Sequence, residues 1–214
     1  MIIEPVESGP FFTIGYLVGD EKSGKAIVVD APKDSTPRFL GAATRLDLTI
    51  ELLVNTHGHW DHIADNLALQ LQTMAPIAIH RLDEPRIENP IPVFFRLPFE
   101  IPPTKAGRYL EAGDVVEVGN LKFNVLFTPG HTEGGICLYE PNEKILFSGD
   151  TLFAGSVGRV DLPGGDWDTL MHSIHEKLLT LQDDVTVYPG HGPSTTIGLE
   201  RKRNPFLQPD DERN

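Results

Sequence analysis

The sequence is poor in cysteine, in basic residues and in long apolar runs, and each shortage excludes a class of protein. The single cysteine, Cys137, cannot form an internal disulfide, which fits a reducing compartment. Lys and Arg number 18 against 31 Asp and Glu, and the net charge of −13 argues against a nucleic-acid or anionic-lipid surface. No apolar stretch reaches the roughly 20 residues of a transmembrane helix, and no signal-peptide pattern opens the chain. We therefore expect a cytoplasmic protein that acts on a small molecule, with no nucleic-acid or membrane partner.

The 214 residues, 40% hydrophobic and 23% charged, suit one globular domain over residues 1–214. A turn at Gly119-Asn120 indicates a hairpin, and Ser35 and Asp166 are suitable helix caps. The tail from about residue 197 is charged and broken by proline. Strands, a helix, then strands and a helix again predict two similar halves around stacked sheets, an α/β layered fold. Strands are expected at 12–18, 26–29, 52–54, 77–79, 115–118, 121–127, 136–139, 145–147 and 185–188, and helices at 36–45, 63–74 and 167–181.

A cluster of polar side chains follows the apolar segment that ends in the sequence VNTHGHWDHI. His57 and His59, two residues apart on a loop that leaves a strand, can meet one ion. Asp61 and His62 can turn to a second position nearby. Imidazole nitrogens and carboxylate oxygens are ligands of zinc, iron and manganese, so the loop predicts a metal site.

Three further apolar runs end in the same way, each with a turn of small residues and one ligand-type side chain. The sequence VLFTPGH ends at His131, ILFSGD ends at Asp150, and VTVYPGH ends at His191. Turns at the ends of strands in layered α/β sheets gather on a common edge, where ligand sites form. Seven residues are therefore expected to converge: His57, His59, Asp61, His62, His131, Asp150 and His191.

Four other chemically reactive side chains are interpreted as structural. A histidine beside a strand or on a helix without a turn motif is usually a hydrogen-bonded packing residue, and we expect no metal ligand among His80, His172 and His175. Cys137 lies within an alternating strand pattern, which predicts a buried, inert thiol.

Residues 85–107 carry six prolines and the aromatic residues Phe94, Phe95 and Phe99. Regular structure is not expected there. Two interpretations stay open, a surface loop folded onto its own aromatic side chains and a lid that covers the substrate. In the second, Phe94, Phe95 and Phe99 line the substrate entrance.

The four motifs, THGHWDH, TPGHT, SGDT and YPGH, come in the order found in the metallo-β-lactamase superfamily, and the chain resembles that superfamily from Thr56 to Gly192. The resemblance implies a four-layer αββα sandwich with two divalent metal ions, zinc first, with iron or manganese as alternatives. It assigns His57, His59 and His131 to one metal and Asp61, His62 and His191 to the other. Asp150 bridges them, and Asp61 and Asp150 are the catalytic carboxylates that position the nucleophile.

Within that superfamily the stretches TPGHTEGGI, FSGDTLFAGSVGR and VYPGHGPSTTIG resemble glyoxalase II-like hydrolases. The resemblance implies hydrolysis of a thioester, such as S-lactoylglutathione, by a metal-bound hydroxide. Two departures matter. Gly58 stands where glyoxalase II has a third histidine, and the chain stops soon after RKRNPFL, where glyoxalase II continues into a helical domain that helps to hold glutathione. We therefore expect the metal site to be complete and glutathione recognition to be weak.

Residues that hold the substrate are harder to identify. Arg159 and Lys144 are candidates for a substrate carboxylate, as are Arg201, Lys202 and Arg203 in the tail, although a solvated surface position is the favoured interpretation of each. Thr132 and Ser148 are expected near the site as structural turn residues. Asp161 is a candidate for orienting a ligand histidine.

The sequence allows three alternative functions. A persulfide dioxygenase of the same fold, with a single iron held by two histidines and an aspartate, is favoured by the GRVD stretch and by the HSIHEKLLTL segment. A nuclease of the same superfamily is disfavoured by the acidic net charge. A non-enzymatic binding protein is disfavoured by the complete ligand set.

Overall fold

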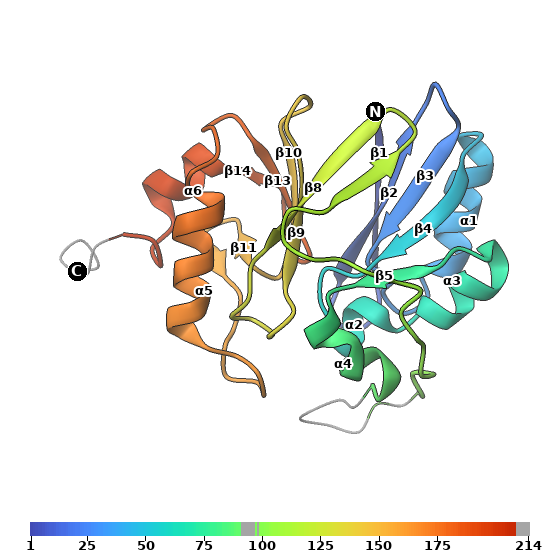
Figure 1. Ribbon diagram of the computed structural model, residues 1–214, viewed down its shortest axis with the longest axis horizontal. Coiled ribbons are helices and arrows are strands. Elements are labelled where there is room, and N and C mark those ends of the chain that lie inside the picture. Colours follow the sequence, from blue (N-terminus) through green and yellow to red (C-terminus); the bar gives the residue numbers. More distant parts are fainter. Residues whose placement is uncertain (91–96, 98, 209–214) are drawn as a thin grey trace.

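The computed structural model describes residues 1–90, 97 and 99–208 and shows two mixed sheets of six strands each within these ranges (Figure 1). The first sheet has the order β1 (Ile2–Ser8), β2 (Thr13–Asp20), β3 (Lys25–Val29), β4 (Thr49–Val54), β5 (Ile77–Ile79) and β6 (Arg108–Tyr109). The second has the order β14 (Thr195–Thr196), β13 (Thr186–Pro189), β10 (Ile145–Gly149), β9 (Ile136–Glu140), β8 (Leu121–Phe127) and β7 (Val115–Val118). A short hairpin of β11 (Leu152–Phe153) and β12 (Ser156–Val157) follows β10.

Three apolar cores separate four layers. The middle core lies between the sheets and contains Val29, Val54, Phe123 and Phe147. On the outer face of the first sheet, Phe39 of α1 (Thr36–Arg45) and Leu69 of α3 (Asn66–Thr73) pack against the strands. On the outer face of the second sheet lie α5 (Trp167–Ser173), the π-helical turn Ile174–Leu178 and α6 (Ile197–Arg203). The expected αββα layering is therefore present.

The strand directions bring the chemically important chain segments to one edge. Strands β3 and β4 are parallel, and so are β10 and β13, while β8 and β10 are both antiparallel to β9. In each half, the carboxyl ends of these strands consequently point the same way. The short helices α2 (Trp60–Ile63) and α4 (Glu84–Glu88), with the 3₁₀ turn Arg81–Asp83, lie at this edge (Figure 1).

The prediction of one continuous helix over residues 63–74 is wrong. Two helices, α2 and α3, replace it, with a break at Ala64 and Asp65. The break has a physical cause, because the Asp65 carboxylate accepts hydrogen bonds from the backbone N–H and the hydroxyl of Thr36, both 3.0 Å long. Asp65 therefore caps α1, where Ser35 had been expected to do so, and Ser35 makes no side-chain capping bond. The i, i+4, i+8 spacing of Ile63, Leu67 and Leu71 predicts one buried helical face, but Leu71 is 64% exposed.

The ends of the chain also differ from expectation. Strand β1 had no counterpart among the predicted elements, and α6 occupies part of the tail expected to be irregular. The Thr196 hydroxyl caps α6 by accepting a hydrogen bond from the N–H of Leu199. The prolines of the tail gave no indication of this helix in the sequence. Asp166 caps α5 through the N–H of Thr169, as expected. None of the helices in the described ranges is long and apolar enough to cross a bilayer.

Candidate metal centre

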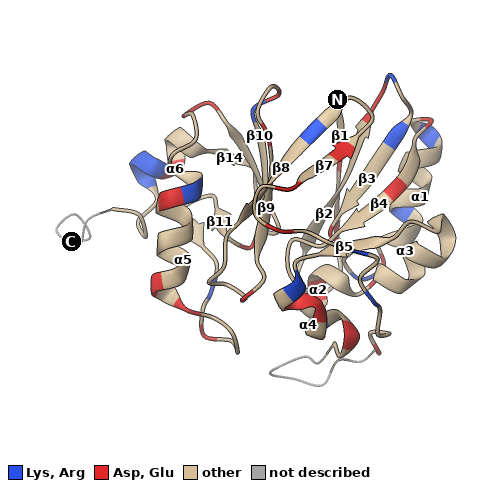
Figure 2. Ribbon diagram, viewed as in Figure 1, with Lys and Arg blue, Asp and Glu red and all other residues tan. Residues whose placement is uncertain are grey.

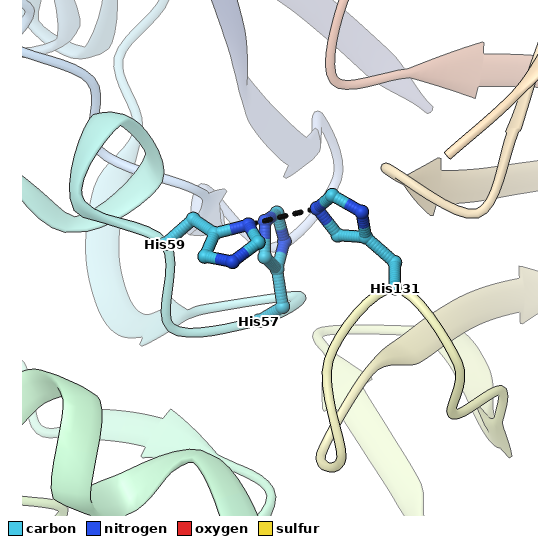
Figure 3. Close-up of side chains that lie close together, drawn as sticks. All are labelled: His57, His59 and His131. Atoms are coloured by element: carbon cyan, nitrogen blue, oxygen red, sulfur yellow. Dashed lines mark hydrogen bonds between the residues drawn. The ribbon is translucent and has the colours of Figure 1, made fainter. Parts of the chain in front are cut away.

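The first histidine cluster forms where two loops meet, one after β4 and one after β8. His57, His59 and His131 offer ligand atoms that all lie within 4.8 Å of one another, and all three side chains are buried. Figure 3 shows the three rings facing a common point, with Nδ1 of His59 2.8 Å from Nε2 of His131. Loops from the two sheets thus supply one three-nitrogen group.

The second cluster joins the start of α2 to the end of β13. Asp61, His62 and His191 also offer ligand atoms within 4.8 Å of one another. Oδ2 of Asp61 lies 3.3 Å from Nε2 of His191 and 3.6 Å from Nε2 of His62. The hydroxyl of Thr13 donates to the same Asp61 oxygen at 2.8 Å, which fixes this carboxylate from β2.

Asp150, directly after β10, contacts both clusters. Its Oδ1 lies 3.3 Å from Nε2 of His62, and its Oδ2 lies 3.5 Å from Nε2 of both His131 and His191. The structure therefore brings together all seven residues expected to converge, with the carboxylate of Asp150 between the two groups of three.

The donor atoms fit divalent metal ions. Nε2 of His57 and His62 and Oδ1 of Asp150 are buried and have no hydrogen-bond partner in the described structure. Buried polar atoms without partners are costly and rare, so atoms of this kind, aimed at a common point, indicate a missing ligand. Imidazole nitrogens with carboxylate oxygens form the set that zinc, iron and manganese accept.

The metallo-β-lactamase superfamily model matches residues 9–191, which include all seven of these residues. The chain belongs to the metallo-β-lactamase superfamily. The resemblance inferred from the four motifs is thus confirmed.

Relatives within the superfamily differ in their activities. The chain is 35% identical to the hydroxyacylglutathione hydrolase GloC of Haemophilus influenzae over 89% of this chain and 91% of that protein. It is 31% identical to the mitochondrial persulfide dioxygenase ETHE1 of Homo sapiens over 96% of this chain and 74% of that protein. Both named activities are therefore represented at similar identity.

Solved structures support the fold in the same way. The BLEG-1 B3 metallo-β-lactamase superposes with a TM-score of 0.90 at 34% identity, over 97% of this chain and all of that one. A second structure, solved in a di-iron-bound form, gives a TM-score of 0.82 at 36% identity and covers 95% of this chain and all of that one. The metallo-β-lactamase fold and a metal site built from His and Asp are thus shown.

Burial and the neighbouring carboxylates shift the pKa values of the clustered histidines in opposite directions. Burial lowers the pKa of His57 and His131, and it lowers the pKa of His59 to about 3, so these rings are neutral ligands. Burial opposes the charged forms of His62 and His191, but the neighbouring carboxylates prevail; they raise the pKa of His62 and bring that of His191 to about 9.

Burial would likewise raise the pKa of Asp61, but His62 and His191 lower it to about 2. The two histidines and the neighbouring carboxylates thus stabilise one another's charged forms.

Asp30 is a functional residue that the sequence reasoning missed. It follows β3, is 2% exposed and accepts three hydrogen bonds of 2.8 Å: from the N–H of Thr56, from the Thr56 hydroxyl and from Nδ1 of His62. The Thr56 oxygen lies 3.1 Å from Nδ1 of His57. Asp30 thus directs Nε2 of His62, and through Thr56 also Nε2 of His57, toward the metal positions. The same strand-end rule that found Asp150 would have found it, because VVD ends an apolar run in an aspartate.

The histidines on the second half of the fold are oriented by backbone carbonyls. Nδ1 of His131 donates to the carbonyl of Arg159 at 2.7 Å, and Nδ1 of His191 lies 3.2 Å from the carbonyl of Phe11. Asp161, the expected partner of a ligand histidine, instead pairs with the Arg159 guanidinium at 2.7 Å.

The candidate substrate residues are scattered. Arg159 lies beside the site but is paired with Asp161. Lys144 precedes β10, so it lies at the opposite end of that strand from Asp150, and it pairs with Asp184. Arg201 binds the carbonyls of Leu179 and Leu181 and pairs with Asp183, and α6, which carries Lys202 and Arg203, packs on the outer layer. Phe94 and Phe95 lie outside the described residues.

The side chains that the sequence indicates to be structural lie outside the two clusters of possible metal ligands among the described residues. Nδ1 of His80 accepts from the N–H of Leu82, and its ring stacks on Phe127 with centroids 4.4 Å apart. His172 lies in α5 and His175 in the π-helical turn, on the outer layer. Cys137 is fully buried, and burial raises the pKa of its thiol to about 11. Ser148 donates to the carbonyl of Leu152, a bond within the turn that carries Asp150.

Proposed function

We propose that this protein is a binuclear metallohydrolase that cleaves thioesters in the manner of glyoxalase II. The observation that carries the proposal is the position of Asp150, which contacts both the histidine triad and the Asp61 group. The first ion would be held by His57, His59 and His131, the second by Asp61, His62 and His191, with Asp150 shared. Two bound divalent cations would supply a hydroxide nucleophile at neutral pH and positive charge for the developing oxyanion.

Neighbouring residues would hold the metal ligands in fixed orientations. Thr13 and His191 hold Asp61, and Asp30 holds His62, so the carboxylate and imidazole of the second position have fixed orientations. A thiolate is a good leaving group, so the reaction needs no strong general acid. This agrees with the site, whose titratable groups are nearly all in the metal-ligand set. The thioester part of the proposal is supported by the relationship to the Haemophilus influenzae hydrolase.

A second candidate is a persulfide dioxygenase activity with one iron, supported by the human relative of that name. The two functions differ in metal content and in oxygen use. A complete second group, Asp61, His62 and His191, favours the hydrolase, because a mononuclear centre does not require it.

One experiment separates the candidates. Protein loaded with Zn²⁺, Mn²⁺ or Fe²⁺ is analysed for metal and assayed for hydrolysis of S-lactoylglutathione and, in parallel, for oxygen uptake with glutathione persulfide. We expect two ions per chain and thioester hydrolysis, which Asp150→Asn abolishes. Asp20→Asn, at the far end of β2 from the site, is the control and keeps the activity. One ion per chain with oxygen uptake would establish the dioxygenase instead.

A further inference from the structure

A buried carboxylate outside the ligand set joins the two loops that form the first histidine cluster. Asp83, fully buried at the end of the 3₁₀ turn, accepts a hydrogen bond of 2.7 Å from the N–H of Gly58, between His57 and His59. The same oxygen accepts from the hydroxyl of Thr132 at 2.8 Å, next to His131. Its other oxygen accepts from the N–H of Gly134 at 2.8 Å.

The surroundings of Asp83 leave little room for adjustment. A Cβ atom added to Gly134 would lie 2.8 Å from Cβ and Cγ of Asp83, and one added to Gly58 would lie 3.0 Å from its carbonyl oxygen and 2.6 Å from Cβ of Arg86. Both loops therefore approach this turn through glycines. A fully buried carboxylate is costly unless its oxygens are hydrogen-bonded, and here three donors and the nearby Arg86 guanidinium, 3.5 Å away, provide that compensation.

His59 depends on this arrangement more than the other ligands do. His57 is oriented by Thr56, His62 by Asp30, and His131 and His191 by carbonyl oxygens. For His59, the described structure gives Nδ1 only the neighbouring ligand His131, and Nε2 has no partner. Its ring is therefore positioned through its backbone, and Asp83 binds that backbone one residue earlier.

We infer that Asp83 is a positioning residue for the first metal, which sets the separation between the His57–His59 loop and the His131 loop. Asp83 acts through the backbone and Thr132 and touches neither metal nor substrate. Its loss should weaken the His57, His59 and His131 position selectively and leave the Asp61, His62 and His191 position nearly intact.

The test measures metal affinity in metal-free protein, so it does not depend on the proposed thioesterase activity. Apo protein is titrated with Co²⁺ against a chelator, and the two binding constants and the visible spectrum of each site are recorded. Because partners of metal ligands typically contribute about 10- to 100-fold in affinity, Asp83→Asn should weaken one of the two constants about tenfold or more. An amide in place of the carboxylate presents an NH₂ group to at least one of the N–H or O–H donors.

The matched control is Asp20→Asn. Asp20 is a buried carboxylate, 6% exposed, that also accepts hydrogen bonds from another loop, from the backbone and side-chain N–H groups of Asn120. It joins the two sheets at the end of β2 remote from Thr13. The Asp20→Asn substitution should lower the stability of the protein without changing either metal-binding constant. Equal losses in the two variants would make the role of Asp83 merely structural and would overturn the inference.

A double-mutant cycle with His59→Ala identifies the path of the effect. If Asp83 acts by positioning His59 and its loop, Asp83→Asn should add little to the loss already caused by His59→Ala, whereas independent effects would add. Additive losses overturn the inference. Should Asp83→Asn fail to fold, Thr132→Val removes one donor with little change of shape, and a smaller loss at the same site is expected. Unchanged affinity in a folded Thr132→Val protein would contradict the proposed connection.

Discussion

Replacing Asp30 with asparagine should weaken both metal positions, although Asp30 is a ligand of neither. Asp30 has φ +58°, in the left-handed region that asparagine tolerates, so the substitution leaves the backbone unstrained. Oδ2 of Asp30 receives the His62 Nδ1–H and the Thr56 hydroxyl, while Oδ1 receives the Thr56 N–H. An amide cannot accept at both positions. One orientation removes the two bonds that fix the histidines, and the other places an NH₂ group against the backbone of the ligand loop.

The expected magnitude follows from these bonds. A hydrogen bond to a charged group contributes about 1.5–3 kcal/mol, and about 1.4 kcal/mol corresponds to a tenfold change in affinity. Asp30→Asn should therefore cost about 10- to 100-fold at the second position, through His62, and a smaller factor at the first, through Thr56 and His57. Competitive Zn²⁺ titration of the apo protein against a chelator measures both constants. Thr56→Val, which removes only the link to His57, should affect the first position alone. Two constants within twofold of wild type in Asp30→Asn would refute the assigned role.

Three other outcomes are expected. Asp150→Ala should lose both metals by elemental analysis while its circular dichroism stays native, and retention of one tightly bound ion would show that Asp150 is not shared. Cys137 should resist alkylation at pH 8 in the folded protein, because burial raises the pKa of its thiol to about 11, and react once in denaturant; Cys137→Ala should cost about 1 kcal/mol of unfolding free energy and keep turnover. Hydrolysis of S-lactoylglutathione should show a measurable kcat with a high KM, since Arg159, Lys144 and Arg201 are each paired with an aspartate; a low KM confined to glutathione thioesters would contradict this.

The layered fold and the convergence of the seven side chains were predictable because both depend on local patterns. Each ligand follows an apolar strand, and strands of like direction in a sheet bring such ends to one edge. The caps Asp166 and Thr196 show the limit of this approach. Asp166 precedes a helix with a periodic apolar pattern and is recognised as a cap. Thr196 precedes the charged segment IGLERKR, and the prolines that follow residue 203 argue against a helix there, so this short helix is missed.

Errors arose where a side chain serves an element distant in sequence. Asp65 was assigned to the interior of a helix, but it caps α1 across 29 residues, and the helix breaks at that point. Lys144 precedes a strand whose other end carries Asp150, so proximity in sequence did not mean proximity to the site. Such long-range contacts have no periodicity and leave no mark in a single sequence.

The carboxylates around this centre divide into those that hold metal and those that hold the ligands, and only the first group has a recognisable motif. Asp61 and Asp150 stand in the four motifs. Asp30 lies outside them, directly after β3, and Asp83 lies at the end of the 3₁₀ turn that follows β5. Yet Asp30 fixes the imidazoles of His57 and His62, and Asp83 fixes the loops of His59 and His131. Four of the five ligand histidines therefore depend on two buried aspartates outside the motifs. In this chain the supporting carboxylates and the loops they hold therefore set the geometry in which the seven side chains meet.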